Sequence, residues 1–177
     1  MTKTEIIAAA EKNFNLLTAV CNSMAEADLF KRPGQKWSAA EHVQHLVIST
    51  NTTTLAYSLP GFLMRWVAGK PNRPSRTFAE LQQKYDTKLG AGGKASGRFI
   101  PPKLDAGYGK AKLMTRWNRA ADRFINALTN NRTEADLDNY LAKHPLLGRI
   151  TLRELCYFTI FHTEHHLHSI QKSVEAI

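Results

Sequence analysis

Cysteine is scarce in this chain. Cys21 and Cys156 are the only two, and they form no CxxC pair. This excludes a disulfide framework of the kind that secreted domains use. Both cysteines lie within apolar helical patterns, so we expect buried, reduced thiols and a cytoplasmic protein. Residues 1–17 contain acids and an Asn where a signal peptide needs an uninterrupted apolar core, and we therefore expect no export.

Long apolar runs, internal repeats and low-complexity tracts are also missing. No apolar run approaches the roughly 20 residues that cross a bilayer, so we expect no contact with a membrane. The lack of a fixed repeat period excludes a solenoid. Hydrophobic residues make up 43% of the 177 residues and charged residues 22%, which is typical of globular proteins. The length predicts one domain over residues 1–177.

Acidic residues are in deficit, and the formal net charge is +9. Most of the excess lies in residues 65–112, which contain eleven lysines and arginines against three acids, a net charge of +8. A nucleic-acid-binding protein places such charge on a defined face, whereas here it belongs to one connecting segment. We interpret the segment as a solvated basic loop that also suits an anionic substrate. Nucleic-acid binding is retained only as an alternative.

Four long amphipathic helices follow from the spacing of apolar residues. The first covers residues 4–24. The second begins after Ser38, runs towards Pro60 and resumes over 62–67. The third covers 110–128. These helices show apolar residues three, four and seven positions apart, among them Ile7, Phe14, Leu17, Val20 and Met24 in the first and Leu113, Trp117, Phe124 and Leu128 in the third.

Two capping boxes fix where the second and fourth helices begin. Ser38 is followed three residues later by Glu41, and Thr151 by Glu154, so that each hydroxyl and carboxylate can bind the other's backbone N–H. The fourth helix then runs to about residue 174. Together the four helices predict an all-α fold, a four-helix bundle in which ligand sites are built from inward side chains.

The connections between these helices differ in length. Residues 70–102, rich in Pro and Gly, predict a long crossover between the second and third helices, with a short helix over 78–87. Residues 144–148 predict an irregular stretch before the last helix. We find no alternation typical of strands and expect none.

Histidine is concentrated in two places. Of seven, four lie in residues 161–168 and two in 42–45. His162 and His166 differ by only about 40° around a helix, so both imidazoles face the core together. His45 shares its helical stripe with Ile48 and Leu55, which indicates that it also faces the core.

Three neutral imidazoles from two helices can hold one Zn²⁺ or Ni²⁺ and leave positions for water or substrate. We therefore predict His45, His162 and His166 as metal ligands. His165 and His168 lie about 60° and 120° from His162 and are expected outside the site or facing solvent. His42 lies about 60° from His45 and is expected to neighbour the ligands, with a place among them as the alternative. The alternative is that all of these are ordinary core or surface histidines with common hydrogen bonds.

A family resemblance rests on two motifs, Gly34-x-x-Trp37-Ser38-x-x-Glu41-x-x-x-His45-Leu46 and His162-x-x-His165-His166. With the Arg32-Pro33 lead-in and the Leu147-Gly148 entry to the last helix, the chain resembles the DinB-like (DinB/YfiT-like) family. The resemblance implies a four-helix bundle with an open three-histidine metal site, often in a homodimer, and its ligands fall on His45, His162 and His166. Many members carry a Gln three residues after the last histidine, whereas Ser169 stands here, so any role of that Gln does not transfer.

The function expected from these observations is a metal-dependent enzyme. The resemblance implies either a hydrolase or a transferase or isomerase that uses a small thiol, acting on a small-molecule substrate that is anionic or a thiol. No catalytic residue is assigned, because Glu164, the nearest carboxylate, falls about 200° from His162. Trp37 is expected to pack at the entry of the second helix. The alternatives are a non-catalytic metal-binding module and a basic nucleic-acid-binding protein.

Overall fold

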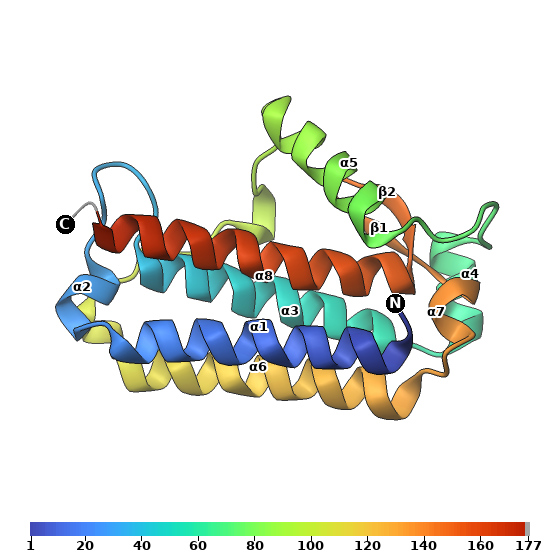
Figure 1. Ribbon diagram of the computed structural model, residues 1–177, viewed down its shortest axis with the longest axis horizontal. Helices are drawn as coiled ribbons and strands as arrows, with labels where there is room; N and C mark the ends of the chain where they lie inside the picture. Colours follow the sequence, from blue (N-terminus) through green and yellow to red (C-terminus); the bar gives the residue numbers. More distant parts are fainter. Residues whose placement is uncertain (176–177) are drawn as a thin grey trace.

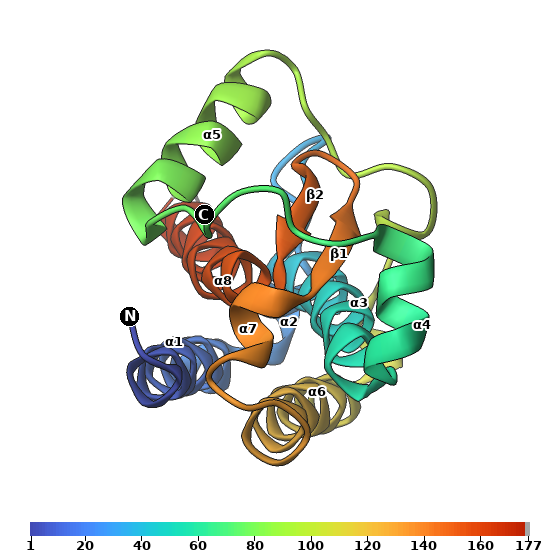
Figure 2. The ribbon, with the colours of Figure 1, turned by 90° about the vertical axis from the view of Figure 1, so that its right-hand side faces the viewer.

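A computed structural model describes residues 1–175, and it is mostly helical. The four longest helices are α1 (Lys3–Ser23), α3 (Ala39–Ser58), α6 (Lys110–Asn131) and α8 (Leu152–Glu175). They lie side by side along the long axis of the molecule (Figure 1). Seen end-on, α1 and α3 are each flanked by α6 and α8 (Figure 2), and these pairs are in contact. The long helices predicted from the sequence are therefore all present.

Both predicted capping boxes form. The Ser38 backbone N–H donates to Glu41 Oε2 at 2.8 Å, and the Glu41 N–H donates to the Ser38 hydroxyl at 3.2 Å. At the start of α8 the Thr151 N–H donates to Glu154 Oε2 at 3.0 Å, and the Glu154 N–H to the Thr151 hydroxyl at 3.2 Å. These pairs satisfy backbone donors that a helix start leaves free, so α3 and α8 begin at defined residues. This fixes the position along each helix of the histidines that follow.

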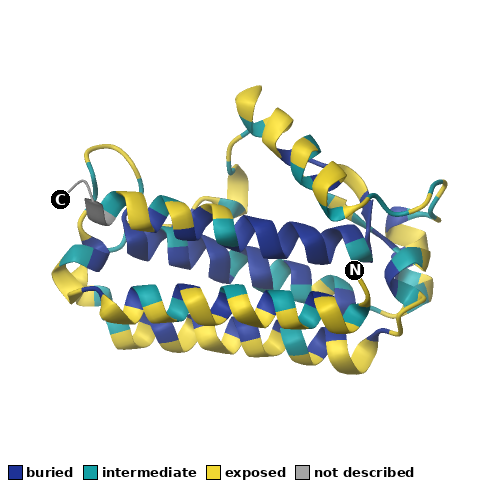
Figure 3. Cartoon of the chain, in the orientation of Figure 1, coloured by how far each residue is buried: buried dark blue, intermediate teal, exposed yellow. Residues whose placement is uncertain are grey.

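The core between α1, α3 and α6 is aromatic. Phe14 meets Trp117 and Phe124 edge to face, with ring centroids 5.3 and 5.7 Å apart, and Tyr57 meets Phe124 at 5.6 Å. All four side chains are buried, and the buried faces of the long helices turn towards one another (Figure 3). Truncating such a ring to Ala typically costs about 3–5 kcal/mol. The packing holds α3 in register with its neighbours.

The segment between α3 and α6 is the long crossover that the sequence predicts. It contains α4 (Gly61–Ala68), α5 (Phe78–Gly90) and two short 3-10 helices, η1 (Gly97–Phe99) and η2 (Ala106–Tyr108). The predicted resumption over 62–67 corresponds to α4, and the predicted short helix over 78–87 to α5. In Figure 1, α5 lies across the outer side of α8, and η1 contacts α3. The crossover thus covers one side of the α3–α8 pair.

The expectation that the chain has no strand was wrong. β1 (Leu141–His144) and β2 (Gly148–Thr151) pair antiparallel, with Leu141 opposite Thr151 and His144 opposite Gly148. Each strand has four residues, too few for a period of two to emerge, and burial in β2 does not alternate. The short helices α2 (Glu26–Phe30) and α7 (Asp136–Asn139) were missed for the same reason of length.

One stripe on α3 differs from its prediction. His45 is buried, but Leu55 is 58% exposed and Ile48 only half-buried, so these positions do not share a core face. The helix packs through a neighbouring face that includes Val43, Leu46, Val47, Thr50, Thr53 and Tyr57. His45 lies at the edge of that face, where the packed interior gives way to a cavity. His45 is therefore buried because it borders this packed face, and not because it shares a stripe with Leu55.

Cys21 and Cys156 are free and buried, in agreement with the sequence. Among the described residues, no helix has the length and apolar character needed to cross a membrane.

Candidate metal centre

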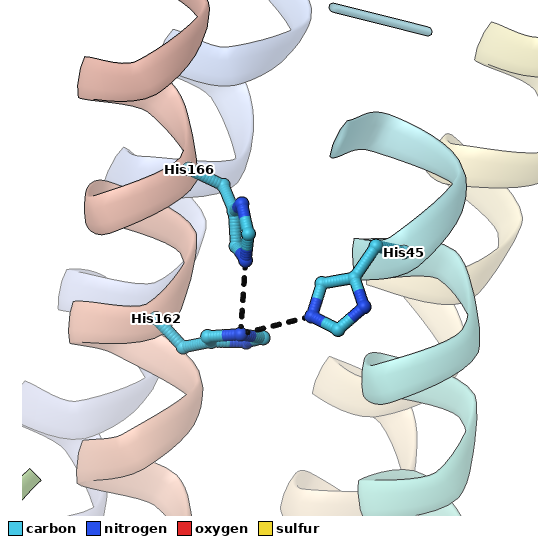
Figure 4. A group of neighbouring side chains, drawn as sticks. All are labelled: His45, His162 and His166. Carbon is cyan, nitrogen blue, oxygen red and sulfur yellow. Dashed lines mark hydrogen bonds between the residues drawn. The ribbon is translucent and has the colours of Figure 1, made fainter. Parts of the chain in front are cut away.

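Three histidines converge between α3 and α8. His45 comes from α3, and His162 and His166 come from successive turns of α8, with all three rings directed into the space between the helices (Figure 4). Each side chain is only 5–6% exposed. One ring nitrogen from each lies within 4.8 Å of the others, a grouping able to hold a metal ion. The structure thus brings together the three residues that the sequence singled out.

The spacing of the ring nitrogens suits a common ion. His162 Nε2 lies 3.1 Å from His45 Nε2 and 3.1 Å from His166 Nε2. Ligands about 2.05 Å from a zinc ion are about 3.3 Å apart at a tetrahedral angle and about 2.9 Å apart at a right angle. A proton on His162 Nε2 can be donated to only one of these two neighbours, so with lone pairs on both of them the other contact is not a hydrogen bond. A cation that binds the lone pairs of all three nitrogens would account for both short distances.

Hydrogen bonds on the far side of the rings set which nitrogen carries the proton. His45 Nδ1 lies 2.6 Å from the carbonyl oxygen of Phe99, which can only accept, so the proton is on Nδ1 and Nε2 keeps its lone pair. His42 Nδ1 lies 2.8 Å from His166 Nδ1. With His166 as the donor of that bond, its Nε2 is also free to ligate. Partners of this kind orient metal-binding histidines and fix their tautomer.

The histidines of the centre are kept neutral. Burial, reinforced by the neighbouring histidines, holds the pKa of His162 and of His166 well below the ordinary value. Burial also lowers the pKa of His45, and lowers that of His42 to about 4. Neutral imidazole is the form that binds a metal ion, so at neutral pH the rings need not release a proton first.

Trp37 and His42 form the second layer around these rings. The Trp37 indole is stacked on His166 at 6.3 Å with an interplanar angle of 18°, and its ring lies 5.2 Å from that of His45. Trp37 was predicted to pack at the entry of the second helix, and it packs there against the three-histidine group. His42 has the neighbouring position predicted for it, in contact with His166.

A cavity of about 800 Å³ opens beside the three histidines. Its walls come from α3, α8, the crossover from Gly93 to Ile100 and the β1–β2 hairpin, and most are apolar. The polar part of the lining is unbalanced: it includes Lys94, Arg98 and Lys143 but, within residues 1–175, no Asp or Glu. This electrostatic environment favours an anion and offers no carboxylate base. The apolar lining includes Trp37, Leu89, Phe99, Ile100, Leu155 and Phe158.

The remaining histidines of the motif point outward. His165 and His168 are exposed, as predicted, although His165 also borders the cavity. Glu164 is not among the residues that line the cavity. The carbonyl of Phe99, the ring of Tyr85 and His144 also lie at the site, and none of them was predicted from the sequence. No local motif indicates them, because they reach the site from distant segments.

The profile of one protein family, described as the DinB superfamily, matches residues 9–170 of the chain. No curated protein and no solved structure matches the chain.

Proposed function

We propose that this chain, which belongs to the DinB superfamily, is a metal-dependent enzyme built on a four-helix bundle. His45, His162 and His166 hold one divalent ion, Zn²⁺ or Ni²⁺. The observation that carries the proposal is the convergence of three buried, neutral imidazoles beside a large cavity. A structural metal site is closed by four protein ligands, whereas three ligands beside a cavity leave room for a substrate.

When bound, the ion supplies Lewis acidity, which lowers the pKa of a water or a thiol and polarises a carbonyl group. The chain's own residues do the rest. Phe99 and His42 hold His45 and His166 in the tautomers that ligate, and the apolar walls limit the access of water. The proposed reaction is a hydrolysis or the transfer or isomerisation of a small thiol adduct. A hydrolase on this site would take its base from a histidine or from solvent, because no carboxylate lines the cavity.

The proposed substrate is a small molecule that carries an anionic group or a thiol. Lys94, Arg98 and Lys143 border the cavity, and a cleft lined by one sign of charge raises the local concentration of the opposite ion. The basic crossover thus receives a role as part of the cavity wall, and this arrangement weighs against the alternative of a nucleic-acid-binding face. Binding to duplex or single strands that falls steeply with added salt would restore that alternative.

We also propose a cytoplasmic homodimer. The buried free thiols of Cys21 and Cys156 suit a reducing compartment. On α4, Phe62 is 77% and Trp66 83% exposed, and paired large apolar side chains of this kind suit a protein interface. Light scattering tests the oligomeric state. A non-catalytic metal-binding module is the second candidate, and a fourth protein ligand in a metal-bound structure would favour it.

Elemental analysis of the purified protein tests the metal site. Wild type is expected to contain one divalent ion per chain, and His166→Ala to lose it. His165→Ala is the matched control, since it changes the adjacent and exposed histidine of the same helix. Equal metal content in wild type and His166→Ala would remove the proposal.

A further inference from the structure

His144 belongs to the wall of the metal cavity, although it lies outside both histidine motifs. It is the last residue of β1, and the hairpin turns through Pro145, Leu146 and Leu147 to reach Gly148. Its Nδ1 accepts two backbone hydrogen bonds from that turn, from Leu146 N–H at 3.2 Å and Leu147 N–H at 3.1 Å. The turn therefore holds the imidazole ring in one orientation.

These two bonds also determine the protonation of the ring. A nitrogen that accepts from two N–H groups carries no proton, so a neutral His144 has its proton on Nε2. Burial lowers the pKa of His144 to about 4, which keeps the ring neutral at physiological pH. His144 is thus fixed as a neutral hydrogen-bond donor through Nε2.

The Nε2–H group has no partner among the residues that the structure describes. Within that part of the chain, the buried polar side-chain atoms left without a partner are Gln44 Oε1 and Arg132 Nε. His144 Nε2 is not among them, so it is open to the cavity or to solvent rather than enclosed. Nδ1 has a structural role, since it accepts the N–H groups of the turn. Nε2–H has no such role within the protein and is free to donate to another molecule.

A single aromatic ring contacts both His144 and one of the proposed metal ligands. The Phe158 ring centroid lies 4.2 Å from that of His144 and 4.6 Å from that of His162, on which it is stacked. A small molecule in the cavity can therefore reach both the three-histidine group and the edge of His144.

We propose that His144 binds the substrate, with its Nε2–H donating to an acceptor oxygen of a small molecule whose other end ligates the metal. The inference rests on the proposed function. It narrows the substrate class to molecules with a metal-binding group at one end and a carboxylate or carbonyl oxygen at the other, separated by a short spacer that lies over Phe158. His144 selects the oxygen, and the basic residues at the cavity rim supply charge without defined geometry.

The tautomer can be measured on its own. In protein labelled with ¹⁵N-histidine, the NMR signals of His144 are expected to show an unprotonated Nδ1 and a protonated Nε2 at pH 7, with and without bound zinc. His144→Asn identifies the signals. Protonation of Nδ1 in the metal-free protein would overturn the inference, because the unpartnered Nε2 would then carry no proton to donate.

Binding is tested by calorimetry on zinc-loaded protein with a series of α,ω-dicarboxylates, from malonate to pimelate, and the matching monocarboxylates. We expect one dicarboxylate to bind about tenfold more tightly than its monocarboxylate, which is the contribution typical of a hydrogen bond to a charged group. His144→Asn keeps an acceptor oxygen for the turn and removes the Nε2–H. It is expected to bring the two affinities to within about twofold of each other, a loss of most of that hydrogen-bond contribution.

Lys143→Ala is the matched control, since it removes a cavity cation one residue away and leaves the donor in place. It should weaken all anions alike and keep the preferred chain length. Any of three results overturns the inference: the preference for one chain length is absent from wild type, it survives in His144→Asn, or it disappears only in Lys143→Ala. If the wild-type protein binds no divalent ion, the proposed function fails first, and the metal analysis reports that separately.

Discussion

Helix α8 carries two buried polar clusters, and they are completed in different ways. Near its start, Glu154 is fully buried, and its carboxylate accepts from both guanidinium nitrogens of Arg73 at 2.7 and 2.9 Å. Backbone N–H groups of Arg76 and Thr151 donate to it at 2.8 and 3.0 Å. Burial alone would raise the pKa of Glu154, but these donors hold it below the ordinary value. Every oxygen of this cluster is satisfied by the protein.

Two turns further along the same helix, the three-histidine group is built in the opposite way. The outer nitrogens of His45 and His166 are bound by Phe99 and His42, while the inner nitrogens of all three rings face one another. The chain supplies acceptors there and no cation. We interpret the buried polar cluster that the protein completes as a structural clamp, and the one that it leaves incomplete as a candidate binding site. The following experiments test that distinction.

Removing the carboxylate of Glu154 is expected to have the largest effect on stability. Glu154→Ala leaves Arg73 and Arg76 without their partner, and since both remain partly exposed we expect a loss of about 3 kcal/mol in the free energy of unfolding. Urea unfolding measures it. Metal content should not change. Glu164→Ala on the same helix is the control and should stay close to wild type, and a similar loss in both variants would contradict the clamp.

Metal removal should destabilise the protein to a slightly smaller extent. Free zinc at 100 times its dissociation constant stabilises the folded state by about 2.7 kcal/mol, provided that the unfolded chain does not bind it. Thermal unfolding with zinc and with a chelator is expected to show this difference in wild type. His162→Phe should unfold at the same temperature in both conditions. A zinc-dependent shift that persists in His162→Phe would mean that the ion binds elsewhere.

The outer partners of the histidines should affect affinity without changing the number of ions bound. His42→Ala removes the group bound to His166 Nδ1, and loss of such a partner typically weakens metal binding by about 10–100-fold. Competition with a chromogenic chelator measures the affinity. His168→Ala, at an exposed position of α8, should bind zinc as wild type does. An unchanged affinity in His42→Ala would show that the contact does not orient the ligand.

The smallest effect, taken per pH unit, concerns the pH dependence of stability. The pKa of His144 falls from 6.5 to about 4 on folding because of burial. Between these values the unfolded chain binds a proton that the folded chain does not, so the stability of the metal-free protein decreases as the pH falls through this range. His144→Asn should reduce that dependence by at most about 1.4 kcal/mol per pH unit. Urea unfolding from pH 6.5 to 4.5 checks it, and equal slopes would place His144 in solvent.

The sequence predicts those parts of the molecule whose signals are local. Helices of twenty or more residues repeat their apolar spacing many times, and the capping pairs Ser38–Glu41 and Thr151–Glu154 place their starts to within a residue. The spacing of His162 and His166 by one turn indicates that they point together. Their meeting with His45 depends on the packing of α3 on α8, and it was the motif, rather than the stripe through Leu55, that indicated it correctly.

The residues that surround the three histidines could not be predicted from the sequence, for physical reasons. The Phe99 contact uses a backbone oxygen, which every residue has, so no residue type marks it. His144 gains its fixed tautomer from a three-residue turn between strands of four residues, which are too short to show a period. Tyr85 reaches the cavity from α5, and its neighbours along the chain do not reveal where α5 packs.

The bond between His45 and the Phe99 carbonyl joins a proposed metal ligand to the crossover. Thermodynamic reciprocity requires that whatever loosens residues 97–99 also weakens the hold on the ion, and that the ion in turn restrains this stretch of chain. Amide hydrogen exchange at these residues should therefore slow when zinc is added. If the ion binds as proposed, entry of a molecule past the crossover and retention of the ion are coupled through one peptide oxygen.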